Sequence, residues 1–480
     1  MYNNIIDILF MGNYMGKLSS VFTSVDQELL DYKLKPEISN LPSWFSGQVL
    51  RVGPAKFEYG KIKLNHWFDG LAMLYSFNSN GKDICFSNKY LESEQYIAAK
   101  KGRMKYDEFG TMVPSKISKI AAVIKTILGL QTEKPSFNVN IISIKNKLLA
   151  TSEVTTMLEF NRKDLKTLKE FKFVDGLKGQ FSCAHPQFDP VTKEQFNFVV
   201  DISKDCKYSL YKVSKDSCER EVLHQFSNQQ FIYNHTLFLT ENYVVLYLGP
   251  LRANPIDFLS KPISEVISYD SDAKCQLLIV NRNTHETKLV DAPSFVMLHS
   301  SNAFEKGQKI HLDFIEYTDN LEPYKRFYFE NINNDDCKLE MQVSRVIINL
   351  ENNLVSKVII ADKNAEFVRI NEKFLTNDYQ FMYLANRKDQ AEFFNSIIKI
   401  DLYSNSISEH NFGDDYVSEP IFIANPKAKS EDDGLIFANV IDSSKKLSYI
   451  VYLNATDLSL IYKAYLPIQI PPALHGIYLK

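Results

Sequence analysis

The sequence lacks the signals of several common protein classes. No run approaches the roughly 18 to 20 apolar residues that a transmembrane helix needs. The apolar N-terminal stretch IIDILFMG contains Asp7 and has no basic residues before it, unlike a signal peptide. A net charge of −3 leaves no basic surplus for binding nucleic acid. We therefore expect a cytoplasmic protein, soluble or peripheral to a membrane, that binds no nucleic acid.

Cysteine is also scarce. The six cysteines among 480 residues form no CxxC pair and no spacing typical of a disulfide framework or a zinc site. Reduced thiols are therefore expected. The chain is long for a single domain, but repeat architectures form one unit at this size. We expect one domain over residues 1–480.

What the sequence has in abundance is a repeated hairpin pattern. Two strand-like runs, rich in β-branched and aromatic residues, flank a tight Asn/Asp/Ser turn, and this unit recurs seven times. A period of about 50 residues with several strands per unit is typical of a β-propeller with four-stranded blades. We expect an all-β, seven-bladed propeller; the alternative is an irregular all-β chain with coincidental hairpins. The hairpins begin near Leu74, Leu158, Leu210, Leu278, Val346, Ile398 and Ile450.

Four histidines follow these hairpins at similar distances, from 21 residues (Leu278 to His299) to 27 residues (Leu158 to His185). The inner strand of each propeller blade lines the central axis, so residues at equal phase in different blades converge there. Imidazoles repeated in this way are hard to explain as core filling and predict a metal site made of histidine. One polar residue per unit gives Glu153, His185, His235, His299, Glu366, Glu419 and His475.

The donor set indicates the ion. Four neutral imidazoles suit iron, copper or zinc rather than magnesium or calcium. Zinc more often takes three histidines and a water in a tetrahedral site. Four ligands on an octahedral ion leave two cis positions for dioxygen and a substrate or water, so we prefer iron(II), Fe(2+), one per subunit. The three glutamates need not bind the metal, because a metal-bound imidazole usually donates its other N–H to a carboxylate.

The remaining histidines are expected to play structural or surface roles. His66 precedes the first hairpin and nothing pairs it with a metal, so a structural hydrogen-bonding role is expected. His285 lies in a hairpin turn and should be solvated. The lone residues His224, His311 and His410 are expected at surface or satisfied packing positions.

Several sequence motifs together resemble a known family. They include GQVLRVGP from Gly47, HWFDG from His66, HPQFDP from His185, HSSNAFE from His299 and HG from His475. They occur in the right order over nearly the whole chain. In these motifs the chain resembles the carotenoid cleavage oxygenases, whose animal members include the β-carotene oxygenases and the retinoid isomerohydrolase of the visual cycle.

The resemblance implies a fold and a site. The fold would be a seven-bladed propeller with a helical and loop cap over an axial ferrous iron. The ligands would be His185, His235, His299 and His475. Glu153 would support His235, Glu366 would support His299 and Glu419 would support His475, leaving His185 without a carboxylate partner.

The resemblance also implies a reaction. A non-haem iron(II) dioxygenase would use dioxygen to cleave a carbon–carbon double bond of a carotenoid or apocarotenoid, giving carbonyl products. The same site can serve as a Lewis acid in a retinoid isomerohydrolase, and a stilbene-type substrate is a further alternative. A carotenoid binder without catalysis is a third alternative, against which four intact histidines argue. The oligomeric state is not indicated.

One insertion, over residues 103–135, contains an amphipathic stretch at 116–130. A basic amphipathic helix there is typical of a membrane-surface element, and a lipophilic polyene substrate dissolves in lipid. The alternative is a helix whose apolar face packs on the propeller. The residues on the apolar face would be Ile117, Ile120, Ile124, Ile127 and Leu128, bordered by Lys116, Lys119 and Lys125.

Overall fold

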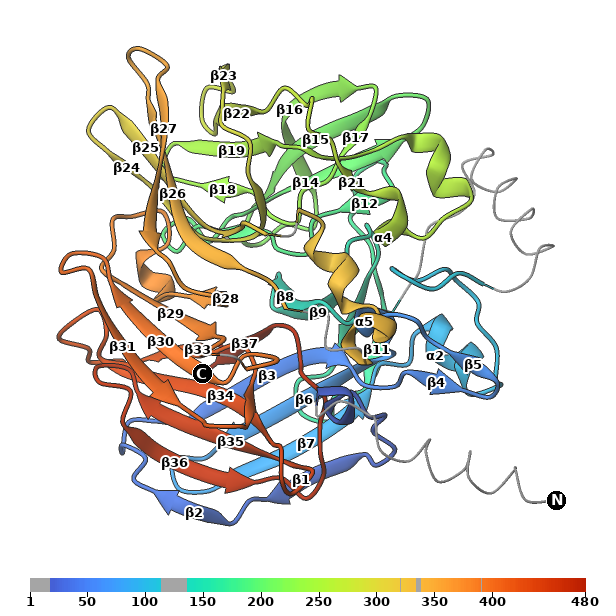
Figure 1. Ribbon diagram of the computed structural model, residues 1–480, viewed down its shortest axis with the longest axis vertical. Helices are drawn as coiled ribbons and strands as arrows, with labels where there is room; N and C mark the ends of the chain where they lie inside the picture. Colours follow the sequence, from blue (N-terminus) through green and yellow to red (C-terminus); the bar gives the residue numbers. More distant parts are fainter. Residues whose placement is uncertain (1–17, 114–135, 320, 334–337, 390) are drawn as a thin grey trace, which may run out of the picture.

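The computed structural model describes residues 18–113, 136–319, 321–333, 338–389 and 391–480. These residues form mostly antiparallel strands with a few short helices (Figure 1), which confirms the all-β class. The predicted amphipathic stretch 116–130 lies outside the described residues, so that prediction remains a prediction.

Seven sheets of four or more strands lie around the middle of the molecule (Figure 1). The first contains the first and last strands of the chain, in the order β1 (Leu29–Lys33), β7 (Ile84–Tyr90), β6 (Ala72–Ser79), β3 (Gly47–Pro54) and β37 (Gly476–Leu479). The second has the order β11 (Thr167–Phe171), β10 (Met157–Phe160), β9 (Lys147–Thr151) and β8 (Asn140–Ile144). The third has β16 (Arg220–Asn228), β15 (Cys206–Val213) and β14 (Gln195–Ile202), with β12 (Phe181–Ser182) and β13 (Gln187–Phe188) both paired to β14.

The other four sheets follow the same plan. One has β23 (Thr287–Asp291), β22 (Gln276–Asn281), β19 (Tyr243–Leu248) and β18 (Phe238–Leu239). The next two have β27 (Val355–Ala361), β26 (Met341–Asn349), β25 (Lys309–Tyr317) and β24 (Val296–Lys306), then β31 (Ser406–Asn411), β30 (Ser396–Asp401), β29 (Phe381–Asn386) and β28 (Ala365–Arg369). The last has β2 (Pro36–Ser39), β36 (Leu460–Tyr465), β35 (Leu447–Asn454) and β34 (Gly434–Asp442), with β32 (Tyr416–Val417) and β33 (Ile421–Ala424) paired to β34.

All seven predicted hairpins are present, each contributing two adjacent strands to a different sheet. Five of them share one turn chemistry. An Asn or Asp accepts a hydrogen bond from the backbone two residues later, and a residue with positive φ follows four residues after it, which reverses the chain tightly. These pairs are Asn161 and Leu165, Asn281 and His285, Asn349 and Asn353, Asp401 and Asn405, and Asn454 and Leu458.

The strands at the opposite edge of these sheets meet at the centre. β18 contacts β13 and β24, β24 contacts β28, and β37 contacts β8 and β33. These inner strands therefore come from neighbouring sheets and surround a common space. Several of them are only two residues long or are interrupted, so they carry little of the alternating pattern that marks a strand in a sequence.

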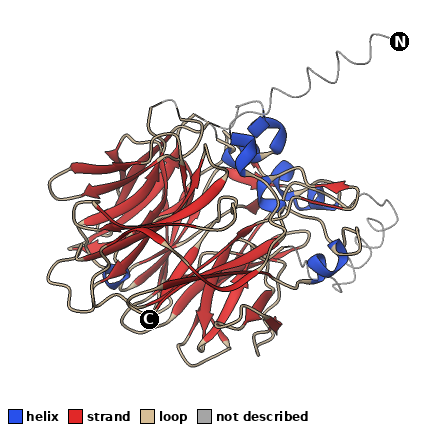
Figure 2. Cartoon of the chain, turned by 90° about the horizontal axis from the view of Figure 1, so that it is seen from below, coloured by secondary structure: helices blue, strands red, loops and turns tan. Residues whose placement is uncertain are grey.

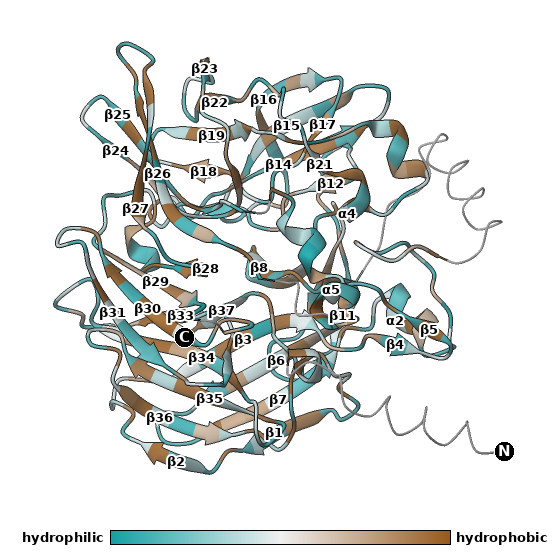
Figure 3. Ribbon diagram, viewed as in Figure 1, coloured by the Kyte–Doolittle hydropathy of each residue, from teal (hydrophilic) through white to brown (hydrophobic). Residues whose placement is uncertain are grey.

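Burial follows the position of a strand in its sheet. β34 is buried along its whole length, whereas β26 alternates between buried and half-buried residues. Figure 3 shows the corresponding mixture of hydrophobic and hydrophilic segments along the strands. The largest apolar cluster includes Phe181, Phe231, Tyr324 and Phe394, so it lies beside the central space.

Most of the short helices lie together on one side of the strands (Figure 2). The short helices of the described residues are η1 (Leu18–Val21), η2 (Trp67–Asp69), α2 (Glu94–Ala99), η3 (Pro255–Leu259), α4 (Ile263–Val266), η4 (Pro323–Phe327), α5 (Phe329–Asn333) and η5 (Glu372–Phe374). Two small sheets complete the fold, β17 (Phe231–Ile232) with β20 (Leu251–Ala253) and β21 (Ser268–Tyr269), and β4 (Glu58–Tyr59) with β5 (Ile62–Lys63). No helix in the described part of the chain has the length and apolar character to cross a bilayer.

Candidate metal centre

The four phased histidines converge on the central space. His185 lies between β12 and β13, His235 between β17 and β18, His299 within β24, and His475 directly before β37. One ring nitrogen from each lies within 4.8 Å of the other three. The Nε2 atoms of His299 and His475 are 3.2 Å apart. The structure thus brings together, from four sheets, the set that the sequence selected.

Each of three histidines contacts a glutamate through Nδ1. The distances from Nδ1 to the carboxylate are 2.7 Å for His235 and Glu153, 2.7 Å for His299 and Glu366, and 2.8 Å for His475 and Glu419. These are the pairs that the family resemblance implied. A carboxylate at Nδ1 fixes the proton there and leaves the Nε2 lone pair free to bind a cation.

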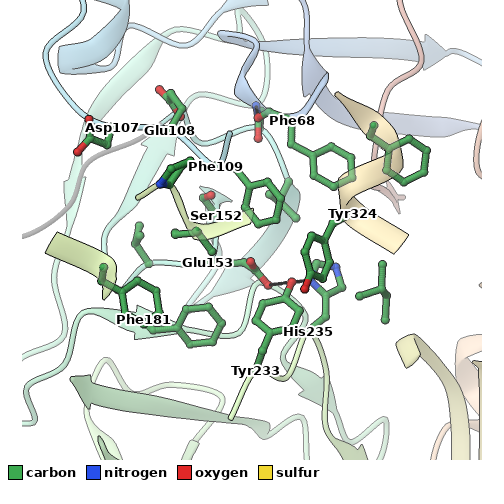
Figure 4. Close-up of a pocket in the computed structure, with 18 of the residues that line it drawn as sticks. Phe68, Asp107, Glu108, Phe109, Ser152, Glu153, Phe181, Tyr233, His235 and Tyr324 are labelled. Carbon is green, nitrogen blue, oxygen red and sulfur yellow. Dashed lines mark hydrogen bonds and ion pairs between the residues drawn. The ribbon is translucent and has the colours of Figure 1, made fainter. Parts of the chain in front are cut away.

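Each glutamate has a further hydrogen-bond partner that sequence reasoning missed. The hydroxyl of Tyr233 donates to Glu153 at 2.9 Å, as Figure 4 shows, and the hydroxyl of Tyr317 donates to Glu366 at 2.9 Å. Nε of Arg369 donates to Glu419 at 2.9 Å. Tyr233 is two residues from His235, but the other two partners come from distant strands and carry no local signal.

Glu153 reaches the site by a different route from the other polar residues. Glu366 and Glu419 lie on or beside inner strands, at the phase of the histidines, whereas Glu153 follows β9. The inner strand of that sheet is β8, which places Asn140 at the centre instead. The amide nitrogen of Asn140 lies 3.5 Å from Nδ1 of His185, the histidine without a carboxylate partner. Choosing one polar residue per repeat unit therefore identified Glu153 correctly as a neighbour of the histidines. Its position in the repeat was wrong, because Asn140 occupies the inner strand of that sheet.

Two of the inner strands have irregular backbone where they carry side chains of the centre. The pairing of β24 with β25 shifts register between Met297 and Ser300, around His299. The pairing of β28 with β29 shifts between Glu366 and Arg369, and Phe367 has φ +56°. In a regular strand, residues three apart face opposite sides. The bulge lets Glu366 contact His299 and Arg369 contact Glu419 from one short segment.

Burial keeps the cluster ready for a cation. Burial is the main cause that holds the pKa of His185 and of His475 well below the usual range, and the neighbouring histidines lower it further. The neutral imidazoles are the form that binds metal. Nε2 of His185 is buried without a hydrogen-bond partner among the described residues. Converging neutral nitrogen atoms, three of them backed by carboxylates, are a donor set that fits a divalent metal ion, so the four histidines are placed to hold one.

Two cavities meet at the histidines. The larger, about 860 Å³, reaches His235, His299 and His475 and is lined mainly by apolar residues, including Phe68, Phe109, Phe181 and Tyr324 (Figure 4). The smaller, about 510 Å³, reaches His185, His299 and His475 and has a more polar wall. That wall includes Asn140, Gln187, Ser300, Ser301 and Arg369. The centre is therefore accessible from an apolar side and from a polar side.

His66 has the structural role predicted for it. Its Nδ1 accepts a hydrogen bond from the backbone of Phe68, capping η2, and its Nε2 lies 2.8 Å from the carbonyl of Tyr324. Burial lowers the pKa of His66 to about 4, so the ring stays neutral. The cysteines within the described ranges, five in number, are free.

Comparisons with known proteins agree on one family. The family model described as retinal pigment epithelial membrane protein, RPE65, matches residues 22–480. Human beta,beta-carotene 15,15'-dioxygenase is 25% identical, with 99% of this chain and 95% of that protein covered. The enzyme of the same name from Gallus gallus is 26% identical, covering 93% and 95%. The mitochondrial carotenoid-cleaving dioxygenase of Mustela putorius furo is 25% identical, covering 92% of each.

Solved structures share the fold. A chimera of the proteins ACO and RPE65 superposes with a TM-score of 0.85 at 24% identity, covering 97% of this chain and 98% of that chain. Cobalt-substituted ACO from Synechocystis gives the same TM-score, identity and coverage. With the family model matching from residue 22 to the C-terminal residue, the chain belongs to the RPE65 family of carotenoid oxygenases.

Proposed function

We propose that this protein is a non-haem iron(II) dioxygenase that cleaves a carbon–carbon double bond of a carotenoid or apocarotenoid to carbonyl products. The observation that carries the proposal is the cluster of four histidines at the wall of a large apolar cavity, in a chain of this family. The seven sheets would be the blades of a propeller with the iron on its axis. The helices gathered on one side would form the cap over it.

The donor set supports iron. His185, His235, His299 and His475 would hold one iron(II) per subunit through their Nε2 atoms, with Glu153, Glu366 and Glu419 behind three of them. When bound, the ion supplies the redox chemistry that lets dioxygen react with an alkene. No carboxylate among the described residues belongs to the cluster itself, so the carboxylates act on the histidines.

The large cavity would hold the polyene. Aromatic walls pack along a flat conjugated chain, and an apolar cavity of this size removes the substrate from water. His235, His299 and His475 line the same cavity, so a double bond held there lies beside the histidine cluster. An electron-rich polyene can supply the electrons for the reaction, which requires no organic cofactor.

Neighbouring groups would hold protons in place rather than deliver them. Burial and the adjacent Glu153 raise the pKa of Tyr233 well above its usual range, so the phenol remains protonated and keeps donating to the carboxylate. Burial and Glu366 do the same for the pKa of Tyr317. The tyrosines therefore orient two glutamates, and each glutamate orients a histidine.

We further propose that the protein is cytoplasmic and binds peripherally to membranes, from which it takes its substrate. Stretch 116–130 would be one contact, on the sequence pattern given above. The described residues offer a second contact. η3 buries none of its residues, Ile256 is 68% exposed, and both Ile256 and Leu259 line the large cavity. An exposed apolar helix at a cavity wall suits transfer of a lipophilic molecule.

The test is a product assay. Iron-loaded protein is incubated in detergent with a panel of carotenoids, apocarotenoids, retinyl esters and stilbenes, and the products are identified by mass. The proposal expects pairs of carbonyl products whose carbon atoms sum to those of one carotenoid or apocarotenoid. An isomerised retinol, stilbene cleavage alone, or tight carotenoid binding without products would contradict it and favour one of the alternatives.

A further inference from the structure

The three glutamates of the centre differ in the charge of their own partners. Glu153 accepts hydrogen bonds from His235 and from the neutral phenol of Tyr233. Glu366 similarly has Tyr317. Glu419 instead has Arg369, whose side chain donates to it at 2.9 Å. Among the described residues, the positive charge beside this carboxylate has no counterpart at the other two.

A second arginine increases the asymmetry. Arg51 is fully buried, and its guanidinium donates to the carbonyl oxygens of Glu419 at 2.8 Å and Leu474 at 2.9 Å. It also lies 3.6 Å from Oε2 of Glu419. Two guanidinium groups therefore face one carboxylate. Both contacts partly offset the charge that Glu419 places behind His475.

The hydrogen bonds to Glu419 compete directly. Nδ1 of His475 and Nε of Arg369 both bond to the same oxygen, Oε1, while the backbone N–H of Gly476 donates to Oε2 at 3.1 Å. A carboxylate that already accepts charged donors is a weaker acceptor for the imidazole proton. His475 should consequently donate less electron density to a metal than His235 or His299 does.

We propose that Arg369, acting through Glu419, is a positioning residue that favours the ferrous state of the bound iron. The inference rests on the proposed function, in which the substrate supplies the electrons and no external reductant restores the resting metal. Positive charge near the centre opposes a change from a dication to a trication. A less electron-rich His475 acts in the same direction, because donation stabilises the higher oxidation state.

Substitutions near Glu419 can remove either a positive or a negative charge. Arg369→Gln removes the charge, whereas Arg369→Lys keeps it. Glu372, which is 67% exposed and 3.7 Å from Arg369, partly offsets the arginine, so Glu372→Gln should act in the opposite direction without disturbing the fold. Arg345→Gln is the matched control: Arg345 pairs with the buried Asp313 and is 20% exposed, compared with 23% for Arg369.

The experiment measures the iron midpoint potential of each purified protein without carotenoid, together with its affinity for Co²⁺. For Arg369→Gln we expect the ratio of ferrous to ferric iron at a fixed potential to fall about tenfold, or about 59 mV for a one-electron couple. Arg369→Lys and Arg345→Gln should stay near the wild type, and Glu372→Gln should shift the potential slightly upward. Removing the positive charge should leave Co²⁺ affinity unchanged or raise it.

The outcomes separate electrostatic tuning from simple support. If Arg369 only braces Glu419, Arg369→Gln weakens Co²⁺ binding, and Arg369→Lys and Glu372→Gln do not follow the order of charge; that result overturns the inference. Unchanged potentials in all variants also overturn it. If the iron potentials follow charge but no carotenoid is cleaved, the proposed function fails and the effect of Arg369 stands. A wild-type protein that takes up no iron removes both.

Discussion

Nε2 of His299 lies 3.2 Å from Nε2 of His475, while Nδ1 of each ring contacts a glutamate. With the protons held at Nδ1, the two Nε2 atoms present lone pairs to each other, an unfavourable contact unless a cation lies between them. A metal ion between the two nitrogen atoms would remove this repulsion. The folded protein should therefore bind a metal ion that the unfolded chain does not.

Metal removal should lower stability. A ligand bound only by the folded state raises the free energy of unfolding by about 4 kcal/mol when its concentration is 1,000 times Kd. Thermal unfolding of the chelated protein should occur at a lower temperature than that of the protein reloaded with Fe²⁺ or Co²⁺. An unfolding temperature insensitive to both metals would mean that the histidines do not form a tight site.

Loss of one histidine should abolish tight metal binding. In His235→Ala or His475→Ala, three nitrogen donors remain and the partner glutamate loses its imidazole, so both iron content and turnover should be lost. His285→Ala is the control, because His285 is exposed in a turn. A His235→Ala protein with wild-type iron content would remove His235 from the site.

Changes to the glutamates behind the histidines should be milder. Glu419→Gln keeps the shape of the side chain but removes the charge behind His475, so a loss on the order of 10- to 100-fold in metal affinity or turnover is expected. Glu316→Gln alters another buried glutamate, paired with Lys357, and controls for a general effect of such a change. Equal behaviour of the two variants would argue against a role for Glu419 at the metal.

Asp69 should make stability depend on pH. Burial raises the pKa of Asp69 from 3.8 to about 7 despite hydrogen bonds from Thr111 and Gly110. Between these values the folded state holds a proton that the unfolded state has released, so the contribution of Asp69 to stability falls as pH rises from 4 to 7. Denaturant unfolding across this range should show a shallower decline in Asp69→Asn. A decline identical to that of the wild type would assign it to other groups.

The membrane proposal predicts co-sedimentation with liposomes. Ile256→Asp places a charge on the exposed apolar side of η3 and should weaken binding, as should the double change of Ile120 and Ile124 to Asp. Val191→Asp is the control: Val191 is 79% exposed, in the turn that follows β13. The basic residues of 116–130 should make binding stronger on anionic lipid and weaker at high salt. Wild-type protein that ignores liposomes would favour a more soluble substrate.

How far the sequence predicts this molecule depends on how local each signal is. The hairpins were predictable because a turn such as Asn349 to Asn353 and its alternating flanks lie within a few residues. The histidines were predictable because they repeat at a nearly constant distance from those hairpins. The inner strands that carry them were not, since two-residue strands such as β12 and β18 leave no period to detect.

The second layer of the centre was only partly predictable. Arg369 and Tyr317 act on glutamates from other parts of the fold, and the contact with Glu419 depends on a bulge at Phe367. Neither pairing leaves a spacing that a single sequence reveals. Asn140 was missed for a related reason, because the insertion before β8 displaces that strand from the phase of the repeat.

Titrating metal-free protein with Fe²⁺ while following carotenoid cleavage tests the central claim most directly. Turnover should rise in proportion to bound iron and saturate at about one iron per chain, because the four imidazoles form a single site. His475→Ala should neither bind that iron nor turn over. Cleavage by the metal-free protein, or full activity with iron retained in the His475→Ala variant, would contradict the assignment of the four histidines as the catalytic centre.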